Sequence, residues 1–243
     1  MGIAGGPDIV TSGLVLELDA ADKNSYPGSG TTWYDISGNG NNGTLTNGPT
    51  FTSPGYFSFD GADDFVDTNL NLNQTMTINV WYRRQKVSTA GNNFFIHASA
   101  YNYPASNTWF ELNISDPYYG NGGTIETWAY SLNNGSRQDF LISPYPASIL
   151  GQWRNMCIVF NNSTGTGYLD AANYGSSTPA FTAWDTATTR VPFEFARGRG
   201  YEFNGGAYTY CQCDMSIIQV YNRALTAGEV LQNYNAMKTR FGL

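Results

Sequence analysis

Apolar and polar residues alternate with a period of two along most of the chain. The clearest example is the segment 75–84, TMTINVWYRR. One face would carry Met76, Ile78, Val80 and Tyr82. The other face would carry Thr77, Asn79, Trp81 and Arg83. This alternation is typical of a β-strand that buries one face. We therefore expect the segment to be a strand with these two faces.

The same pattern recurs between turn clusters that are rich in Gly, Asn, Pro and Ser. Further strands are predicted at residues 13–20, 56–60, 64–68, 107–114, 123–132, 152–160, 166–170, 191–196 and 208–221. No segment between them has the period of a helix. The spacing predicts an all-β fold in which two antiparallel sheets pack as a jelly-roll sandwich.

The C-terminal segment LTAGEVLQNYNAMKTRF departs from this pattern. Thr226 is followed three residues later by Glu229, which is the signature of a capping box at the start of a helix. Apolar residues then recur at helical spacing, namely Val230, Leu231, Tyr234 and Met237. Lys238 and Arg240 follow, near the end that favours cations. We expect a short helix with one apolar stripe against the sandwich.

No internal repeat or long linker divides the 243 residues, which suffice to bury a core. We expect one domain over residues 13–243, preceded by a Gly-rich N-terminal arm, residues 1–12. Because the arm has no core of its own, we hypothesise that it docks onto a partner.

Composition narrows the range of functions. The net charge is −7, and the 12 Lys and Arg residues form no basic stripe, so we expect no nucleic-acid partner. The N-terminus does not resemble a signal peptide and no apolar run reaches membrane-spanning length. We therefore expect a soluble product of a cytoplasm with no membrane insertion.

Cysteine and tryptophan are assigned to structural roles. Cys157, Cys211 and Cys213 are too few and too irregularly spaced for a disulfide framework or a zinc site, so they are interpreted as small buried hydrophobes. The tryptophans that lie within or beside strand patterns are assigned to the core: Trp33, Trp81, Trp128 and Trp153.

The stretch DISGNGNNGTLT, residues 35–46, has the first ligand positions of an EF-hand calcium loop. Position twelve is Thr46 instead of the required Glu, and neither flank is helical. Three glycines permit positive φ, and three Asn-Gly pairs signal turns. The glycines are Gly38, Gly40 and Gly43, and the pairs are 39–40, 42–43 and 47–48. We interpret the stretch as structural turns.

Long stretches resemble the laminin-G-like, concanavalin A-like domains of tailed-phage structural proteins. They are IVTSGLVLELDAADKNSYPGSGTTWYDISGNGNNGTLTNGPTF (9–51), FSFDGADDFV (57–66), MTINVWYR (76–83) and IIQVYNRALTAGEVLQNYNAMKTRFGL (217–243). Residues 85–150 match least. The resemblance implies a jelly roll of two antiparallel sheets with a closing helix, and a place among virion proteins.

The function implied is that of a non-enzymatic phage structural protein, namely a capsid-decoration, head-fibre or tail-fibre subunit located in the virion. Its partners would be other virion proteins of the capsid or tail, and self-association into a homo-oligomer is left open. The alternative is a lectin or adhesin that recognises host-surface glycans, which is compatible with a place in a particle. The fold alone settles neither.

Catalytic motifs are incomplete, so a glycan hydrolase is the disfavoured alternative. Glucanases of this fold carry an E-x-D-x-E strand, whereas here Glu17-Leu18-Asp19 is followed by two alanines. His97 is the single histidine, and no G-x-S-x-G elbow accompanies it. Asp63 and Asp64 are adjacent and would face opposite ways on a strand. We expect no enzymatic activity.

No cofactor is expected, although structural calcium remains an open alternative. The resemblance implies that some relatives place an acid for calcium on the last strand, where this chain has Ser216. Asp60 and Asp63 in FDGADD are the candidates for metal ligands, and turn formation is the simpler role for them.

Two loops combine aromatic rings with amides and carboxylates, as sugar-binding sites do. The candidate ligand-binding residues are Tyr101, Asn102 and Tyr103 in the first loop and Asp116, Tyr118, Tyr119 and Asn121 in the second. They would bind a glycan or a protein partner. The alternative is that these tyrosines cover the sandwich edge or meet a neighbouring subunit.

Overall fold

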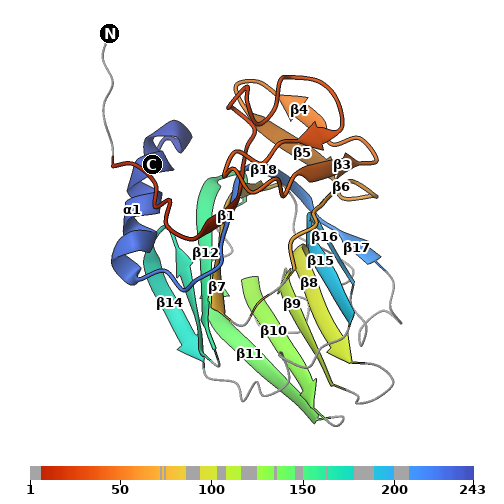
Figure 1. Cartoon of the computed structure of the whole chain (residues 1–243), viewed down its shortest axis with the longest axis vertical. Coiled ribbons are helices and arrows are strands. Elements are labelled where there is room, and N and C mark those ends of the chain that lie inside the picture. Colours follow the sequence, from red (N-terminus) through yellow and green to blue (C-terminus); the bar gives the residue numbers. More distant parts are fainter. Residues whose placement is uncertain are drawn as a thin grey trace.

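The computed structural model describes residues 7–71, 73, 75–85, 94–102, 108–115, 125–133, 136–145, 150–162, 164–177, 189–199 and 208–243. Within these ranges, 94–145, 177, 189–191, 199 and 209 are described by their backbone alone. Two eight-stranded antiparallel sheets face each other, and one short helix lies near the C-terminus (Figure 1). The predicted all-β sandwich with a C-terminal helix is confirmed.

The first sheet, sheet A, has the strand order β14-β13-β12-β7-β18-β5-β4, and β1 also pairs with β18. Its strands are β1 (Leu14–Asp19), β4 (Thr50–Thr52), β5 (Tyr56–Asp60), β7 (Thr75–Arg84), β12 (Trp153–Asn161), β13 (Thr164–Leu169), β14 (Ala172–Ser177) and β18 (Gln212–Tyr221). Along one edge β18 pairs with β7, and along the other it pairs first with β5 and then with β1. Gly55 allows this junction, because a Cβ there would lie 2.3 Å from Cβ of Ala21.

The second sheet, sheet B, has the strand order β11-β10-β9-β8-β15-β6-β3-β2. Its strands are β2 (Thr32–Trp33), β3 (Gly43–Thr46), β6 (Phe65–Asp67), β8 (Phe94–Asn102), β9 (Thr108–Ser115), β10 (Ile125–Asn133), β11 (Ser136–Tyr145) and β15 (Thr189–Phe195). A two-stranded ribbon, β16 (Arg197–Arg199) and β17 (Tyr208–Tyr210), continues from β15.

The core between the sheets uses the period-two pattern that the sequence shows. From sheet A it takes Met76, Ile78, Val80 and Tyr82 of β7, together with Leu16, Leu18, Phe57, Phe59, Met156, Ile158, Phe160, Met215, Ile218 and Val220. From sheet B it takes Trp33, Leu45, Val66, Phe193 and Phe195. Burial of alternate side chains on facing sheets is the main stabilising term of such a sandwich. All three cysteines are buried and free, as predicted.

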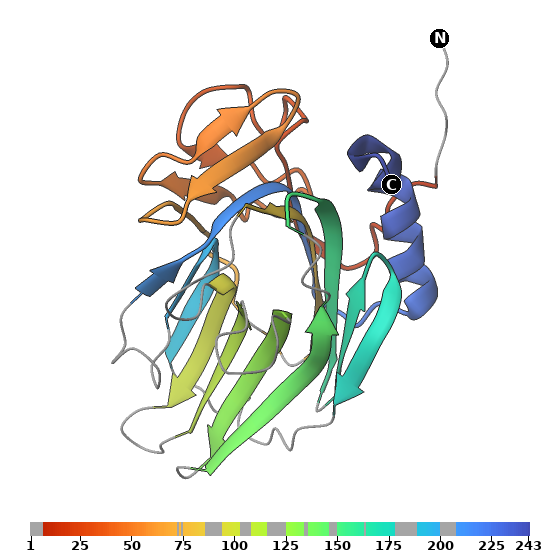
Figure 2. The same ribbon diagram turned by 180° about the vertical axis from the view of Figure 1, so that it is seen from behind.

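The outer face of sheet A is covered as well. The helix α1 (Ala227–Met237) and the 3₁₀ helix η3 (Lys238–Phe241) lie against it, on the side away from sheet B (Figures 1 and 2). A second apolar cluster forms there from Val10, Cys157, Val159, Tyr168, Tyr221, Leu225 and Val230. Trp81 is fully buried, as predicted, but beneath the tail, where it stacks on Phe241 at 4.3 Å between ring centroids.

Four polar side chains cross this covered face as a hydrogen-bonded ladder. Asn155 Nδ2 donates to Asn79 Oδ1 at 2.8 Å, and Asn79 Nδ2 donates to Gln219 Oε1 at 2.9 Å. Gln219 Nε2 donates in turn to Glu17 Oε1 at 3.0 Å. Burial raises the pKa of Glu17, which this hydrogen bond partly offsets. Buried amides cost free energy unless they are hydrogen-bonded, so the ladder makes a polar face compatible with burial.

The predicted capping box starts α1. Thr226 Oγ1 accepts from the backbone N–H of Glu229, and a Glu229 carboxylate oxygen accepts from the N–H of Thr226. A hydrogen-bonded ion pair with Arg223, together with this capping, lowers the pKa of Glu229 to about 2. The apolar stripe of the helix is narrower than predicted, since Val230 is buried and Leu231 is 48% exposed. Consecutive helical residues differ by about 100°, so only one of the two faces the sheet.

Residues 8 to 12 run alongside the helix. Val10 N donates to Asn233 Oδ1 at 2.8 Å, and Gln232 Nε2 donates to the carbonyl of Asp8 at 2.7 Å. Arg223 Nε donates to the carbonyl of Ser12 at 2.9 Å. This part of the predicted N-terminal arm therefore contacts the domain itself, and docking of the arm onto a partner stays a prediction.

The turn interpretation of residues 35–46 agrees with the hydrogen bonding. Asp35 accepts from the N–H groups of Glu17, Ser37 and Asn41, each at 2.9 Å. Positive φ occurs at Gly38 and Gly40, as expected, but the prediction for Gly43 was wrong. Gly43 is the first residue of β3, and it is small because of packing rather than a turn.

We expect Gly43→Ala to destabilise the domain by about 1–3 kcal/mol through overpacking. A Cβ at this position would lie 2.8 Å from Val66 Cγ1 and 3.0 Å from Leu18 Cδ1. Gly228→Ala in α1 is the matched control, because a Cβ there meets only Thr226 Oγ1 at 3.9 Å, and alanine favours a helix. Urea denaturation checks both variants. Equal stability of the two would contradict the packing assignment.

Candidate functional site

The candidate binding residues predicted from the sequence belong to two segments at opposite ends of β9. Tyr101 and Asn102 end β8, and Asn102 lies opposite Thr108 at the start of β9. The remaining candidates lie outside the described residues: Tyr103, Asp116, Tyr118, Tyr119 and Asn121. The loop 103–107 precedes β9 and the loop 116–124 follows it, so they leave opposite ends of an eight-residue strand, roughly 25 Å apart. They are two candidate sites rather than one.

The second of these ends lies near a group of described functional side chains. Ser115, the last residue of β9, is opposite Phe94 at the start of β8. At this same end of sheet B, Ile96 is opposite Phe195, and Phe195 is opposite Val66 of β6. The segment 116–124 therefore starts from the end of sheet B where β6, β15 and the β16–β17 ribbon meet.

At this end five residues form what we call the Arg197 cluster: Phe65, Asp67, Glu194, Arg197 and Tyr208. Strand alternation places the first three on the outer face of sheet B, since their neighbours Val66, Phe193 and Phe195 point into the core. Glu194 lies directly opposite Asp67 in the β15–β6 register. Residues far apart in the sequence are thus brought side by side.

Arg197 is the centre of the cluster. Its guanidinium forms an ion pair with Glu194, which includes an Nε–Oε2 hydrogen bond of 3.1 Å. The guanidinium carbon also lies 3.4 Å from the ring centroid of Phe65 and 4.2 Å from that of Tyr208. Ala196 has φ of 65°, and this kink between β15 and β16 allows Arg197 to turn back onto Glu194.

The cluster contains two carboxylates that differ in burial, and one solvent-exposed aromatic ring. Glu194 is buried and engaged by Arg197, whereas Asp67 is exposed. Partial desolvation raises the pKa of Asp67, and the charge of Glu194 raises it further while Arg197 opposes this. Tyr208 is 43% exposed. An accessible aromatic ring and an exposed carboxylate that both neighbour one guanidinium are suited to binding a polar ligand with an apolar face.

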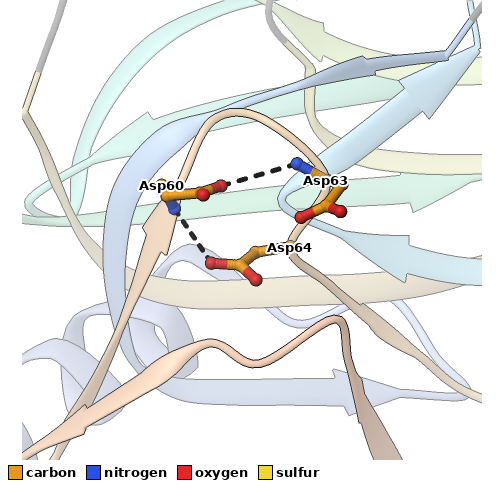
Figure 3. A group of neighbouring side chains, drawn as sticks. All are labelled: Asp60, Asp63 and Asp64. Atoms are coloured by element: carbon orange, nitrogen blue, oxygen red, sulfur yellow. Dashed lines mark hydrogen bonds between the residues drawn. The ribbon is translucent and has the colours of Figure 1, made fainter.

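A second group of carboxylates forms the turn between β5 and β6 (Figure 3). Oxygens of Asp60, Asp63 and Asp64 lie within 4.8 Å of one another. Asp63 and Asp64 lie before β6, so the expectation that they would face opposite ways on a strand does not apply to them. Asp64 is thus a third member that sequence reasoning missed.

The geometry of this acidic turn supports its structural role. Asp60 Oδ1 accepts from Ala62 N at 2.8 Å, and Asp64 Oδ2 accepts from Asp60 N at 3.1 Å. The oxygens that remain are hard donors of the kind that Ca²⁺ prefers, so the chemistry of the turn fits that ion. Burial raises the pKa of Asp64, and the neighbouring carboxylates add to this.

The other acids that sequence reasoning considered are engaged in the fold. Asp19 pairs with Arg240 at 2.7 Å, and Arg240 also donates to Ser216 Oγ at 2.9 Å. A guanidinium of the chain itself therefore occupies the surroundings of Ser216, the position where the resemblance implied an acid. Asp214, which sequence reasoning passed over, is buried and pairs with Arg83 at 2.7 Å. His97 lies opposite Glu194 in register.

Sequence comparison identifies the family. Residues 59–231 match the family Laminin_G_3, described as the concanavalin A-like lectin/glucanases superfamily, and the chain belongs to this family. The search of curated proteins returns no match. In the described part of the chain, no helix has the length and apolar character needed to cross a membrane.

Solved structures with the same fold come from larger proteins. Trypanosoma rangeli sialidase in complex with sialic acid is 14% identical with a TM-score of 0.64, over 97% of this chain and 36% of that one. The binding domain of botulinum neurotoxin serotype D is 15% identical with a TM-score of 0.61, over 93% of this chain and 52% of that one. The binding domain of Paraclostridial Mosquitocidal Protein 1 is 14% identical with a TM-score of 0.57, over 92% of this chain and 52% of that one. The chain thus spans about a third to a half of these proteins, and the likeness shows a lectin-like jelly-roll fold.

We expect Arg197→Met to lower the unfolding free energy by about 3 kcal/mol, because it leaves the buried Glu194 carboxylate without its partner. The side chains of this pair are 13% and 7% exposed. Arg223→Met is the control, since the Arg223–Glu229 pair is 30% and 27% exposed and should contribute at most about 1 kcal/mol. Chemical denaturation compares the two. A loss that is no larger for Arg197 would show that the cluster is not a structural unit.

We expect the wild type to gain stability relative to Asp64→Asn as the pH falls from 7 towards 4. The pKa of Asp64 is raised in the folded state. Its charged form therefore costs stability above that pKa, and the cost disappears as the carboxyl becomes protonated. Thermal denaturation of both proteins between pH 7 and 4 measures this difference in stability. A chelator is present so that bound cations do not contribute. A constant difference between the two proteins across this range would contradict the expected shift.

Proposed function

We propose that the protein is a non-enzymatic structural component of a bacteriophage particle whose lectin-like domain binds a glycan of the host surface. In the particle it would be a capsid-decoration, head-fibre or tail-fibre subunit, with capsid or tail proteins as its other partners. The resemblance of residues 9–51 and 217–243 to tailed-phage structural proteins supports the first part. The family and its fold support the second, since members include lectins.

The observation that carries the binding function is the contrast between the two outer faces. The outer face of sheet A is covered by α1 and η3, which bury Trp81 and the polar ladder. The outer face of sheet B carries the Arg197 cluster, where the Tyr208 ring is accessible and Asp67 lies close to the same guanidinium. The helix lies on the other side of sheet A (Figure 2), so charge and an accessible aromatic ring coincide on the face that the helix leaves uncovered.

A glycan hydrolase is the second candidate, and one observation favours it. Asp67 and Glu194 lie opposite each other on neighbouring strands, and the pKa of Asp67 is raised, as a general acid requires. The ion pair with Arg197 and the burial of Glu194 count against it, because a second catalytic carboxylate must reach the substrate. We therefore place binding first.

A glycan array with the purified domain tests the binding function. We expect saturable binding to a subset of host-surface glycans, with no release of reducing ends during prolonged incubation with the bound glycan. Antibody labelling of purified particles tests the location, and we expect labelling at the capsid or tail. Hydrolysis that is lost in Asp67→Asn and Glu194→Gln would favour the enzyme instead, and unlabelled particles would contradict the place in the virion.

A further inference from the structure

We infer that the Arg197 cluster is a sugar subsite, in which the Tyr208 ring stacks on a neutral pyranose and Asp67 accepts hydrogen bonds from its hydroxyls. The inference rests on the proposed function and names the place and the chemistry of its site. It adds a location on β6 and the β16–β17 ribbon, away from the first candidate loop at Tyr101 and Asn102.

The stacking surface is held in place before any ligand arrives. Tyr208 is opposite Arg199 in the β16–β17 ribbon, and the Arg197 guanidinium lies over its ring. Tyr210, two residues further along, also bonds to Arg197. Because these contacts fix the ring while Tyr208 stays 43% exposed, little conformational freedom is lost when a sugar stacks on it.

The hydroxyl acceptor is Asp67. It is exposed, and its carboxylate has a backbone hydrogen bond at Thr68, which leaves further lone pairs available. Its neighbour Glu194 is occupied by Arg197 through two nitrogens, so the two carboxylates differ in availability. The ring held by Arg197 and the exposed carboxylate near the same guanidinium offer apolar stacking and directional polar contacts together, as a pyranose requires.

The charge at the cluster favours a neutral sugar over an acidic one. Arg197 is already paired, and its guanidinium is flanked by the rings of Phe65 and Tyr208. The acidic turn of Asp60, Asp63 and Asp64 directly precedes β6 and adds negative charge. A sugar carboxylate would therefore meet repulsion, without a free cation among the side chains described at this site. Arg199 lies opposite Tyr208 in the ribbon, but only its backbone is described. The test therefore includes a variant that removes its charge.

The segment 116–124 begins at the end of sheet B that carries the cluster. The segment 116–124, with Asp116, Tyr118, Tyr119 and Asn121, starts after Ser115. Ser115 lies opposite Phe94 in β8, the strand that β16 contacts. Ser115 and the Arg197 cluster therefore lie at the same end of sheet B, whereas Tyr101 and Asn102 lie at the other end of β8.

The test is titration of the full chain with neutral oligosaccharides of galactose, glucose and N-acetylglucosamine, each paired with its sialylated form. We expect the wild type to prefer the neutral forms. Tyr208→Ala and Asp67→Asn should each weaken binding about three- to tenfold, and Tyr208→Phe, which keeps the ring, should lose less than Tyr208→Ala. Leu231→Ala is the control, because Leu231 is 48% exposed on α1, which lies on the outer face of sheet A, and the change should leave the affinity unchanged. Thermal denaturation verifies that each variant is folded.

The outcomes separate the inference from the proposed function. Glycan binding that survives both Tyr208→Ala and Asp67→Asn in folded protein overturns the subsite but leaves the lectin function standing. A preference for sialylated forms that is lost in Arg199→Gln overturns the assignment of a neutral sugar. If the wild type binds no glycan in the array or the titration, the proposed glycan-binding function itself fails.

Discussion

The central strands of sheet A are buried on both faces, and most of the architecture follows from this constraint. On one side, β7 and β18 meet sheet B across the main core. On the other side, they meet α1 and η3 through a second apolar cluster and the stacked ring of Trp81. Unpaired polar groups are costly on strands with two buried faces, and the ladder through Asn79 and Gln219 pairs most of the amide groups there. Asn155 Oδ1 and Trp81 Nε1 stay without a hydrogen-bond partner. The helix is therefore an integral layer of the fold.

This constraint also decides where a ligand can bind. Because the helix covers one outer face, the described surface that remains for recognition includes the outer face of sheet B and its ends. The Arg197 cluster shows how such a surface is built on a rigid sheet. A kink at Ala196 redirects the chain, and an ion pair with Glu194 fixes the side chain that supports Tyr208. The stability of the cluster and its availability for binding thus depend on the same guanidinium.

Sequence reasoning located candidate binding residues by composition, which does not reveal pairings between distant strands. Tyrosine-rich loops are visible in a sequence, whereas the pairing of Asp67 with Glu194 depends on the register of two strands that are distant in the chain. Two of the three carboxylates in the acidic turn were identified from the sequence. Asp60 and Asp63 stood out, but Asp64 joins them only because the chain turns there instead of running on as a strand. The signal that would have indicated this is the Asp-Gly pair at residues 60–61.

The sequence by itself determined the features that depend on near neighbours. The alternation in β7 set the strand and its two faces, Thr226 and Glu229 set the start of α1, and Gly38 and Gly40 set a turn. Only the tertiary structure decided what covers each face. Trp81 is buried by a tail, Gly43 is small because Val66 and Leu18 approach it, and Leu231 is exposed although Val230 is not. The physical reason is that local conformation follows from backbone geometry and nearby side chains, whereas burial follows from contacts between segments that are far apart in the chain.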